Sequence, residues 1–191
     1  MKNSTRSYCF LVAVLLLLST VWHCPAPVFL KLEGVEGESQ TSGHEGEIEI
    51  LSWSWGASQN PGVSNPTGLS YTNDPPVVDR LRVSAIEVEK EVDKATPKLL
   101  LKCCDGTRLN NGELHVTDPG TGQAYLVIKM KNVYISSYQT GGSKGDVVPV
   151  DTVSLNFGEV EFEYTEQEGT GLTHAEGWNF EADSPLPLPP T

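Results

Sequence analysis

The segment EIEILSWSWG, residues 47–56, carries the clearest structural signal in the sequence. Ile48 and Ile50 alternate with glutamates, which is the period-two pattern of a strand with one buried face. At Leu51 the alternation shifts by one residue, and Leu51, Trp53 and Trp55 continue in the opposite phase. Such a shift turns the apolar side chains to the other face unless the strand bends or bulges. We therefore predict one long strand, kinked near Leu51, whose two halves serve different surfaces.

Trp53 and Trp55 lie on one side of the second half and form a large aromatic strip. A tryptophan hides roughly 150–250 Å² when it is buried. Three uses of the strip remain open: part of the core, a contact between subunits, or a platform for a sugar or peptide ligand. Both residues are therefore candidate interface residues.

Length and charge limit the possible functions. A chain of 191 residues has room for one domain with a sizeable core. Its net charge of −12 argues against nucleic-acid binding, which needs a basic face, and against docking on anionic lipid. Glycine and proline are plentiful, while valine, isoleucine and threonine recur in short alternating runs, which favours an all-β domain.

Residues 1–26 resemble a secretory signal peptide. Lys2 and Arg6 precede an apolar run over residues 10–18 that is too short to anchor in a bilayer. Pro27 follows the small residue Ala26, which makes a poor cleavage region, so a true start near Val28 is the alternative. Export to the periplasm or medium is expected if the leader functions, with no membrane contact after its removal.

Four apolar runs each change phase once, within residues 47–56, 80–92, 126–135 and 153–164. Strands that bend in this way suit a small barrel. We predict a mainly β fold: a small closed β-barrel of bent antiparallel strands over residues 27–182, with one short flanking helix. The proline-rich residues 183–191 are predicted to form a disordered tail.

The flanking helix is predicted over residues 96–105. Thr96 is a suitable N-cap, Pro97 occupies the favoured first helical position, and Gly106 can end the helix. Cys103 and Cys104 are adjacent and cannot form an ordinary unstrained disulfide. They are predicted to be small buried apolar residues on the helix face that also holds Leu99, Leu100 and Leu101.

Residues 57–79 form a long polar connection with no periodicity. Such connections in compact domains are usually functional or disordered. Its isolated apolar residues favour an arm that packs against another surface. We predict that this arm is an assembly element. The candidate contact residues in this arm are Val63, Leu69 and Tyr71.

No catalytic, metal or cofactor site is predicted, and no enzyme. His44, His115 and His174 are far apart in the sequence, show no metal-ligand spacing such as HExxH, and are interpreted as solvated surface histidines. No serine lies in a nucleophile-elbow context.

Several segments, in order, resemble the haemolysin-coregulated protein (Hcp) family. The similarity extends from about Val28 to Phe180, and the ordered set is more specific than any single piece. The segments are residues 28–39 (VFLKLEGVEGES), 48–56 (IEILSWSWG), 92–97 (VDKATP), 103–106 (CCDG), 137–143 (SYQTGGS), 153–157 (VSLNF), 160–165 (VEFEYT) and 177–178 (GW).

The resemblance implies a β-barrel with a flanking helix that assembles as a homohexameric ring. It further implies that rings stack into the inner tube of the type VI secretion system, whose lumen carries effectors. Without a working leader, the chain is expected to stay in the cytoplasm until that system secretes it. Spike protein, sheath and effector cargo are the implied partners, and the long loop is expected to reach the adjacent subunit. The alternative is an exported, non-assembling β-barrel domain that uses Trp53 and Trp55 to bind a ligand.

Overall fold

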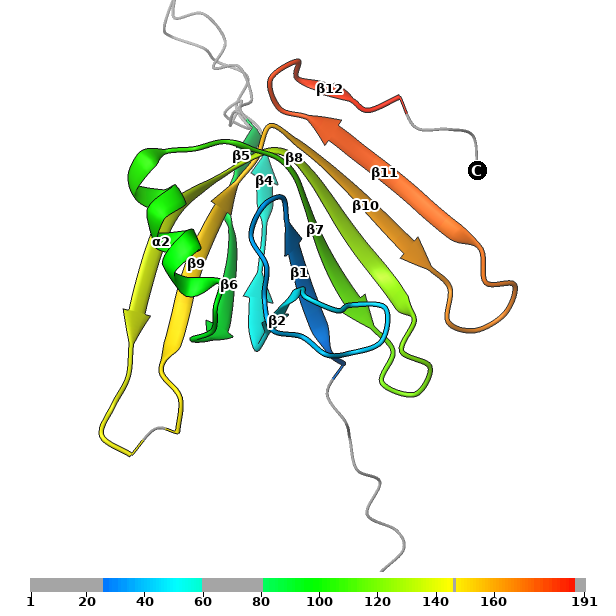
Figure 1. Cartoon of the computed structure of the whole chain (residues 1–191). Coiled ribbons are helices and arrows are strands. Elements are labelled where there is room, and N and C mark those ends of the chain that lie inside the picture. The colour runs from blue at the N-terminus through cyan, green and yellow to red at the C-terminus, as the bar shows by residue number, and fades with distance from the viewer. Residues whose placement is uncertain (1–25, 60–80, 146, 188–191) are drawn as a thin grey trace, which may run out of the picture.

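The computed structural model describes residues 26–59, 81–145 and 147–187. Within these ranges the chain is almost entirely β-structure, with the helix α2 (Thr96–Asp105) on one flank beside β8 and β9 (Figure 1). The strands are β1 (Val28–Leu32), β2 (Ile48–Ile50), β3 (Ser52–Ser54), β4 (Ala57–Gln59), β5 (Leu81–Val83), β6 (Ile86–Glu91), β7 (Leu109–Thr117), β8 (Ala124–Gly141), β9 (Val150–Asn156), β10 (Glu159–Thr165), β11 (Thr173–Asn179) and β12 (Ser184–Pro185).

The long strand β8 organises the sheet. Its first half pairs with β7 and β10, and its second half pairs with β9. One path runs β12-β11-β10-β8-β7-β1-β2, while β9, β6 and β3 continue from the other end of β8. All of these pairings are antiparallel, and β4 and β5 form a separate two-stranded sheet.

The closed barrel predicted from the sequence is wrong: no sheet closes into a barrel in the described ranges. The gap falls at Leu51, where the alternation shifts. Strand β2 before it pairs with β1, and β3 after it pairs with β6. The Leu51 amide donates to the Glu89 carbonyl at 2.7 Å, while the leucine itself is 58% exposed. The kinked strand therefore splits into two short strands with different neighbours.

The other three phase changes also coincide with irregular backbone. Ser84 and Ala85 separate β5 from β6, and Gly158 lies between β9 and β10. Within β8 the change falls at Asn132, which has a positive φ of 54°. Asparagine is one of the few non-glycine residues that adopts this conformation readily. The prediction of a mainly β fold with one short helix is confirmed, although three of the four predicted bent strands are split into separate strands.

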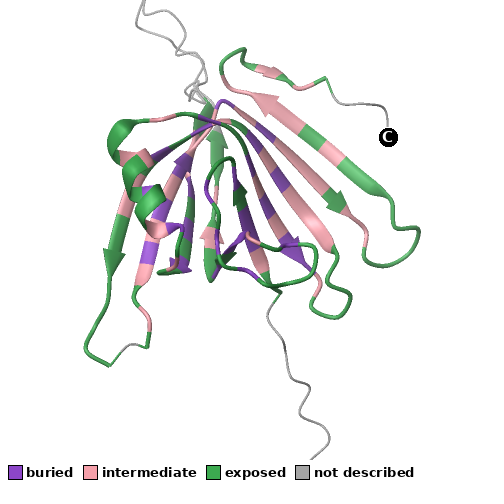
Figure 2. Ribbon diagram, viewed as in Figure 1, coloured by how far each residue is buried: buried purple, intermediate pink, exposed green. Residues whose placement is uncertain are grey.

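Buried side chains from both halves of β8 and its neighbours form one core (Figure 2). Residues that alternate in the sequence also alternate in burial, as in β6, where Ile86 and Val88 are buried and Glu87 and Glu89 exposed. The most deeply buried apolar side chains are Leu30, Ile48, Ile86, Val88, Leu99, Leu114, Ile128, Met130, Val133, Val153 and Leu155.

The buried face of helix α2 contains fewer residues than the sequence suggests. Only Leu99 is buried, whereas Leu100 and Leu101 are exposed. Ala95 is the N-cap residue instead of Thr96, and the Thr96 hydroxyl donates to the buried carboxylate of Asp151. Gly106 ends the helix in the left-handed conformation, with φ 65°, as predicted.

The cysteines differ from the prediction. Cys103 is half-buried against the core, but Cys104 is exposed, so the expectation of two buried cysteines is wrong for Cys104. Replacing Cys104 by serine should change the free energy of unfolding by no more than about 0.5 kcal/mol, because it lies on the surface. Replacing Cys103 should cost more, about 1 kcal/mol, because a hydroxyl is then partly buried. Urea unfolding of the two single variants tests this order, and equal large losses would contradict it.

The C-terminal region is more ordered than predicted. Strand β11 pairs along the whole of β10, and β12 pairs with β11 inside the segment expected to be a disordered tail. The Leu186 amide donates to the Gly177 carbonyl at 2.9 Å, which extends this edge. Residues 188–191 lie outside the described ranges, as does the predicted leader up to residue 25.

Candidate functional site

The two tryptophans of the strip are half-buried and pack against the core. Trp53 lies opposite Val88 in the β3–β6 pair. The ring centroid of Trp55 is 5.1 Å from that of Phe162 and 6.3 Å from that of Phe157. Its indole Nε1 is buried without a hydrogen-bond partner among the described residues. Both side chains thus contribute to packing, and their use in an interface stays a prediction.

The three predicted arm residues Val63, Leu69 and Tyr71 lie within residues 60–80, outside the described ranges. The start of the arm is described as β4, which pairs with β5, so the two ends of the connection lie side by side. A pocket of about 300 Å³ opens where the chain continues at Leu81. It is lined by Leu81, Val83, Ser84, Tyr134, Asn156, Phe157, Phe180 and Asp183.

Several large apolar side chains remain on the surface of the described chain. They are Leu51, Leu81, Val92, Leu100, Leu101, Tyr134, Val147, Tyr164 and Leu172. Single exposed apolar residues are ordinary, but a chain that builds an assembly must keep some of its apolar surface for neighbouring copies.

The turn between β1 and β2 is held by the segment Gly37-Glu38-Ser39. The Gly37 amide donates to the Gly46 carbonyl at 2.8 Å, and the Ser39 amide donates to the Glu47 carbonyl at 3.1 Å. A Cβ atom on Gly37 would lie 2.3 Å from the Glu47 carbonyl oxygen, so only glycine fits. Glu38 accepts a bond from the Lys94 amide at 3.0 Å, which ties the turn to the start of α2.

A buried lysine joins β6, α2 and β9. The Lys90 Nζ lies 2.7 Å from an Asp93 carboxylate oxygen and 3.2 Å from Asp151 Oδ2, and Lys90 is 1% exposed. Thr96 and Tyr138 also donate their hydroxyls to Asp151, the latter at 2.9 Å. Buried charges are tolerated when they are paired and hydrogen-bonded in this way. The segment VDKATP, residues 92–97, supplies two members of this network.

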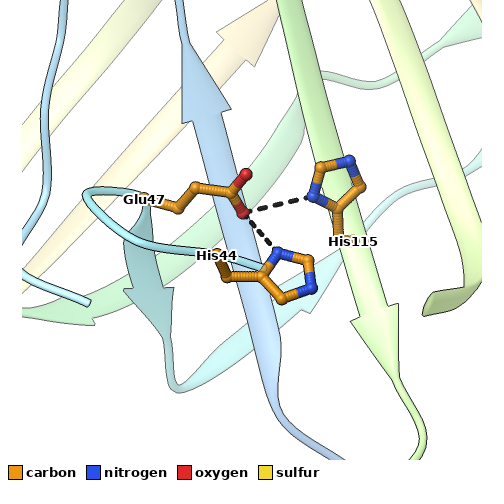
Figure 3. Close-up of side chains that lie close together, drawn as sticks. All are labelled: His44, Glu47 and His115. Atoms are coloured by element: carbon orange, nitrogen blue, oxygen red, sulfur yellow. Dashed lines mark hydrogen bonds and ion pairs between the residues drawn. The ribbon is translucent and has the colours of Figure 1, made fainter. Parts of the chain in front are cut away.

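His44 and His115 are not surface residues, and that prediction is wrong for both. Both imidazoles approach the same oxygen of the Glu47 carboxylate (Figure 3). His44 Nδ1 lies 2.7 Å from Glu47 Oε2, and His115 Nδ1 lies 3.2 Å from the same oxygen. His44 and Glu47 are each 8% exposed. His174 is exposed as predicted and bonds to Glu166 at 3.1 Å.

The fold creates this cluster from two distant parts of the sequence. His44 and Glu47 come from the turn before β2, and His115 comes from β7, with β1 pairing to both β2 and β7. The ring of Phe29 on β1 stacks on His44, with centroids 4.3 Å apart and planes 6° apart. The only feature of the sequence that pointed to a buried histidine was the position of His115 next to Val116 in a predicted strand.

Comparison with known proteins places the fold in one family. Residues 29–164 match the family described as "Type VI secretion system effector, Hcp". "Protein hcp1" of Pseudomonas aeruginosa is 32% identical over 158 residues, covering 80% of this chain and 93% of that protein.

Solved structures agree with this match. Hcp1 from Salmonella typhimurium is 27% identical, with a TM-score of 0.70, covering 85% of this chain and 100% of that one. A type VI secretion system effector from Yersinia pestis is 26% identical, with a TM-score of 0.65, covering 80% and 98%. The family match contains strands β2 to β9 in full and nearly all of β1 and β10. The chain therefore belongs to the Hcp family of the type VI secretion system.

Proposed function

We propose that this chain is the subunit of a homohexameric ring, and that such rings stack into the inner tube of a type VI secretion system. The observation that carries the proposal is the family match over residues 29–164, which includes both halves of the kinked strand and α2. The relatives are covered nearly completely, so the shared part is a whole Hcp domain. The alternative of a non-assembling binding domain is not favoured.

The contact between neighbouring copies is proposed to use the arm of one copy and the exposed apolar residues of the next. A head-to-tail contact closes into a ring when its rotation suits. The pocket beside Leu81 and Tyr134 combines apolar walls with polar groups from Ser84, Asn156 and Asp183, which suits a short segment of extended chain. The Trp55 ring lies beside Phe157, one of the residues that line this pocket.

The remaining partners follow from the same role. The ring is proposed to carry effector cargo in its lumen and to meet the spike protein and the sheath as part of the tube. The chain's part in this process is structural. The net charge of −12 is unsuited to a nucleic-acid cargo held by the bare protein surface.

Residues 1–26 are proposed to provide a route of export besides the type VI machine. Within the described ranges, no helix is long and apolar enough to cross a membrane. We propose that residues 1–26 direct general secretion, with a mature N-terminus between Cys24 and Val28. Sequencing the N-terminus of native protein tests this. A retained Met1, or a start near Val28 that persists when general secretion is blocked, would contradict it.

Light scattering on the purified chain tests assembly. The expected particle mass is six times that of one chain, which is 20.7 kDa when the leader is retained. A single-chain mass at all concentrations would support the non-assembling alternative.

Replacing residues 60–80 with a short Gly-Ser link is expected to abolish rings while the strands still fold. Loops of different length close at similar entropic cost, so the change should be tolerated by the domain itself. Far-UV circular dichroism should show unchanged β-structure while light scattering shows single chains. Rings of unchanged mass would place the contact elsewhere, with Trp53 and Trp55 the next candidates.

Changing Leu69 and Tyr71 together to serine is the milder form of this experiment. Large apolar and aromatic residues dominate most protein contacts, so their loss should weaken assembly by at least about 2 kcal/mol per contact. The expected result is a ring that dissociates at higher protein concentration than the wild type. An unchanged dissociation profile would remove these two residues from the contact.

A further inference from the structure

The cluster of His44, Glu47 and His115 has no assigned role in a tube subunit. We propose that these three residues bind one Zn²⁺ ion and thereby clamp the turn before β2 onto β7. Two imidazoles with one carboxylate are a recurring ligand set for this metal. A fourth position would be left for water.

The donor atoms already lie close to the spacing that zinc requires. Metal–ligand distances near 2.0–2.1 Å in a tetrahedral arrangement put donors about 3.3 Å apart. His115 Nδ1 and Glu47 Oε2 are 3.2 Å apart, and His44 Nδ1 and Glu47 Oε2 are 2.7 Å apart. One donor atom from each residue falls within 4.8 Å of the other two. Small side-chain rotations therefore suffice to surround an ion.

The second ring nitrogen of His115 has the kind of partner that a metal-binding imidazole needs. Its Nδ1 faces Glu47, and its Nε2 lies 3.3 Å from Glu113 Oε2. With zinc on Nδ1, the single N–H is on Nε2 and donates to Glu113. Metal-binding histidines usually have a carboxylate or carbonyl partner of this kind.

The surroundings hold the ligands in place. Phe29 stacks on His44, and the Ser39 amide binds the carbonyl of Glu47, so both ligands from the turn are fixed. The His115 side chain is 12% exposed, which leaves a route for an ion to enter. A metal here would link two segments that are 68 residues apart in sequence.

Zinc titration of the full-length chain, followed by calorimetry and by competition with a coloured chelator, tests the proposal. Wild type should bind one zinc that His115→Gln and His44→Gln each lose. Glu113→Gln should weaken that binding about 10–100-fold, as expected for loss of an outer partner. Zinc should also raise the melting temperature of wild type more than that of these variants.

His174→Gln is the matched control, because it removes an exposed histidine that is also bonded to a glutamate. It should bind zinc as wild type does. Circular dichroism without zinc shows whether the buried variants fold; if they do not, Glu113→Gln decides, since that side chain is 37% exposed. The proposal fails if wild type binds no zinc, if binding survives in both histidine variants through the thiols, or if Glu113→Gln binds as wild type does.

Discussion

Replacing Asp151 by alanine should cost about 3–5 kcal/mol of unfolding free energy, among the largest losses expected from a single change in this domain. The carboxylate is fully buried and accepts bonds from Lys90, Thr96 and Tyr138. Its removal leaves two hydroxyls without their acceptor and takes one of two carboxylates from a buried ammonium. Urea unfolding measures the loss.

The pair Lys131–Glu159, in which the lysine is exposed, provides the control. Its atoms are 3.4 Å apart, close to the 3.2 Å of Lys90 and Asp151, but the Lys131 side chain is 64% exposed. Lys131→Ala should therefore cost about 0–1 kcal/mol. A similar loss in both variants would show that burial does not set the strength of the Lys90 network.

The same carboxylate predicts a pH dependence. Burial acts to raise the pKa of Asp151, but the hydrogen bonds from Thr96, Tyr138 and Lys90 outweigh it and hold the pKa below its usual value. The pKa of an aspartate in the unfolded chain is about 3.9. The ionised group therefore stabilises the fold above about pH 4, and this contribution is lost as the pH falls through the lower folded pKa. Asp151→Asn should show a flatter loss of stability between neutral and acid pH than wild type; parallel curves would contradict the assignment.

Replacing Gly37 by alanine is the second large effect, expected to cost about 3 kcal/mol or more, at or above the usual upper limit for overpacking. The added carbon would lie 2.3 Å from the Glu47 carbonyl oxygen and 2.5 Å from the Ile48 Cα, and neither backbone atom can rotate away. The turn must then separate from β2, and the bonds from Gly37 and Ser39 are lost with it. Chemical unfolding and hydrogen exchange in the turn measure this change.

Gly56→Ala is the matched control. Its nearest neighbour would be Ser84 Oγ at 4.0 Å, and its backbone has no left-handed φ. Stability should be unchanged or slightly increased. If Gly37→Ala is equally harmless, the close approach of the turn to Glu47 is not a feature of the protein in solution.

The alternation of apolar residues predicted the main strands and the places where the backbone is irregular, but it did not predict β4, β11 or β12. Each shift of phase, at Leu51 or Asn132 for example, requires a local backbone change wherever the residues of one segment must keep facing the core. The sequence could not show whether the bent strands close into a barrel. That depends on which neighbour each half of a broken strand pairs with, which is a long-range property.

The buried cluster was missed for a similar reason. His44 and His115 lie on separate segments, and only the pairing of β1 with both β2 and β7 brings them together. Spacing rules detect ligands on one helix or one loop and are blind to this case. Thr96 shows the opposite error, since a residue typical of an N-cap instead donates its hydroxyl to a buried carboxylate.

Negative-stain electron microscopy of the purified full-length protein tests the central claim most directly. Two-dimensional averages should show rings with sixfold symmetry, and stacked rings at high protein concentration. Particles the size of one chain, without rings at any concentration, would contradict the account of this protein as a tube subunit.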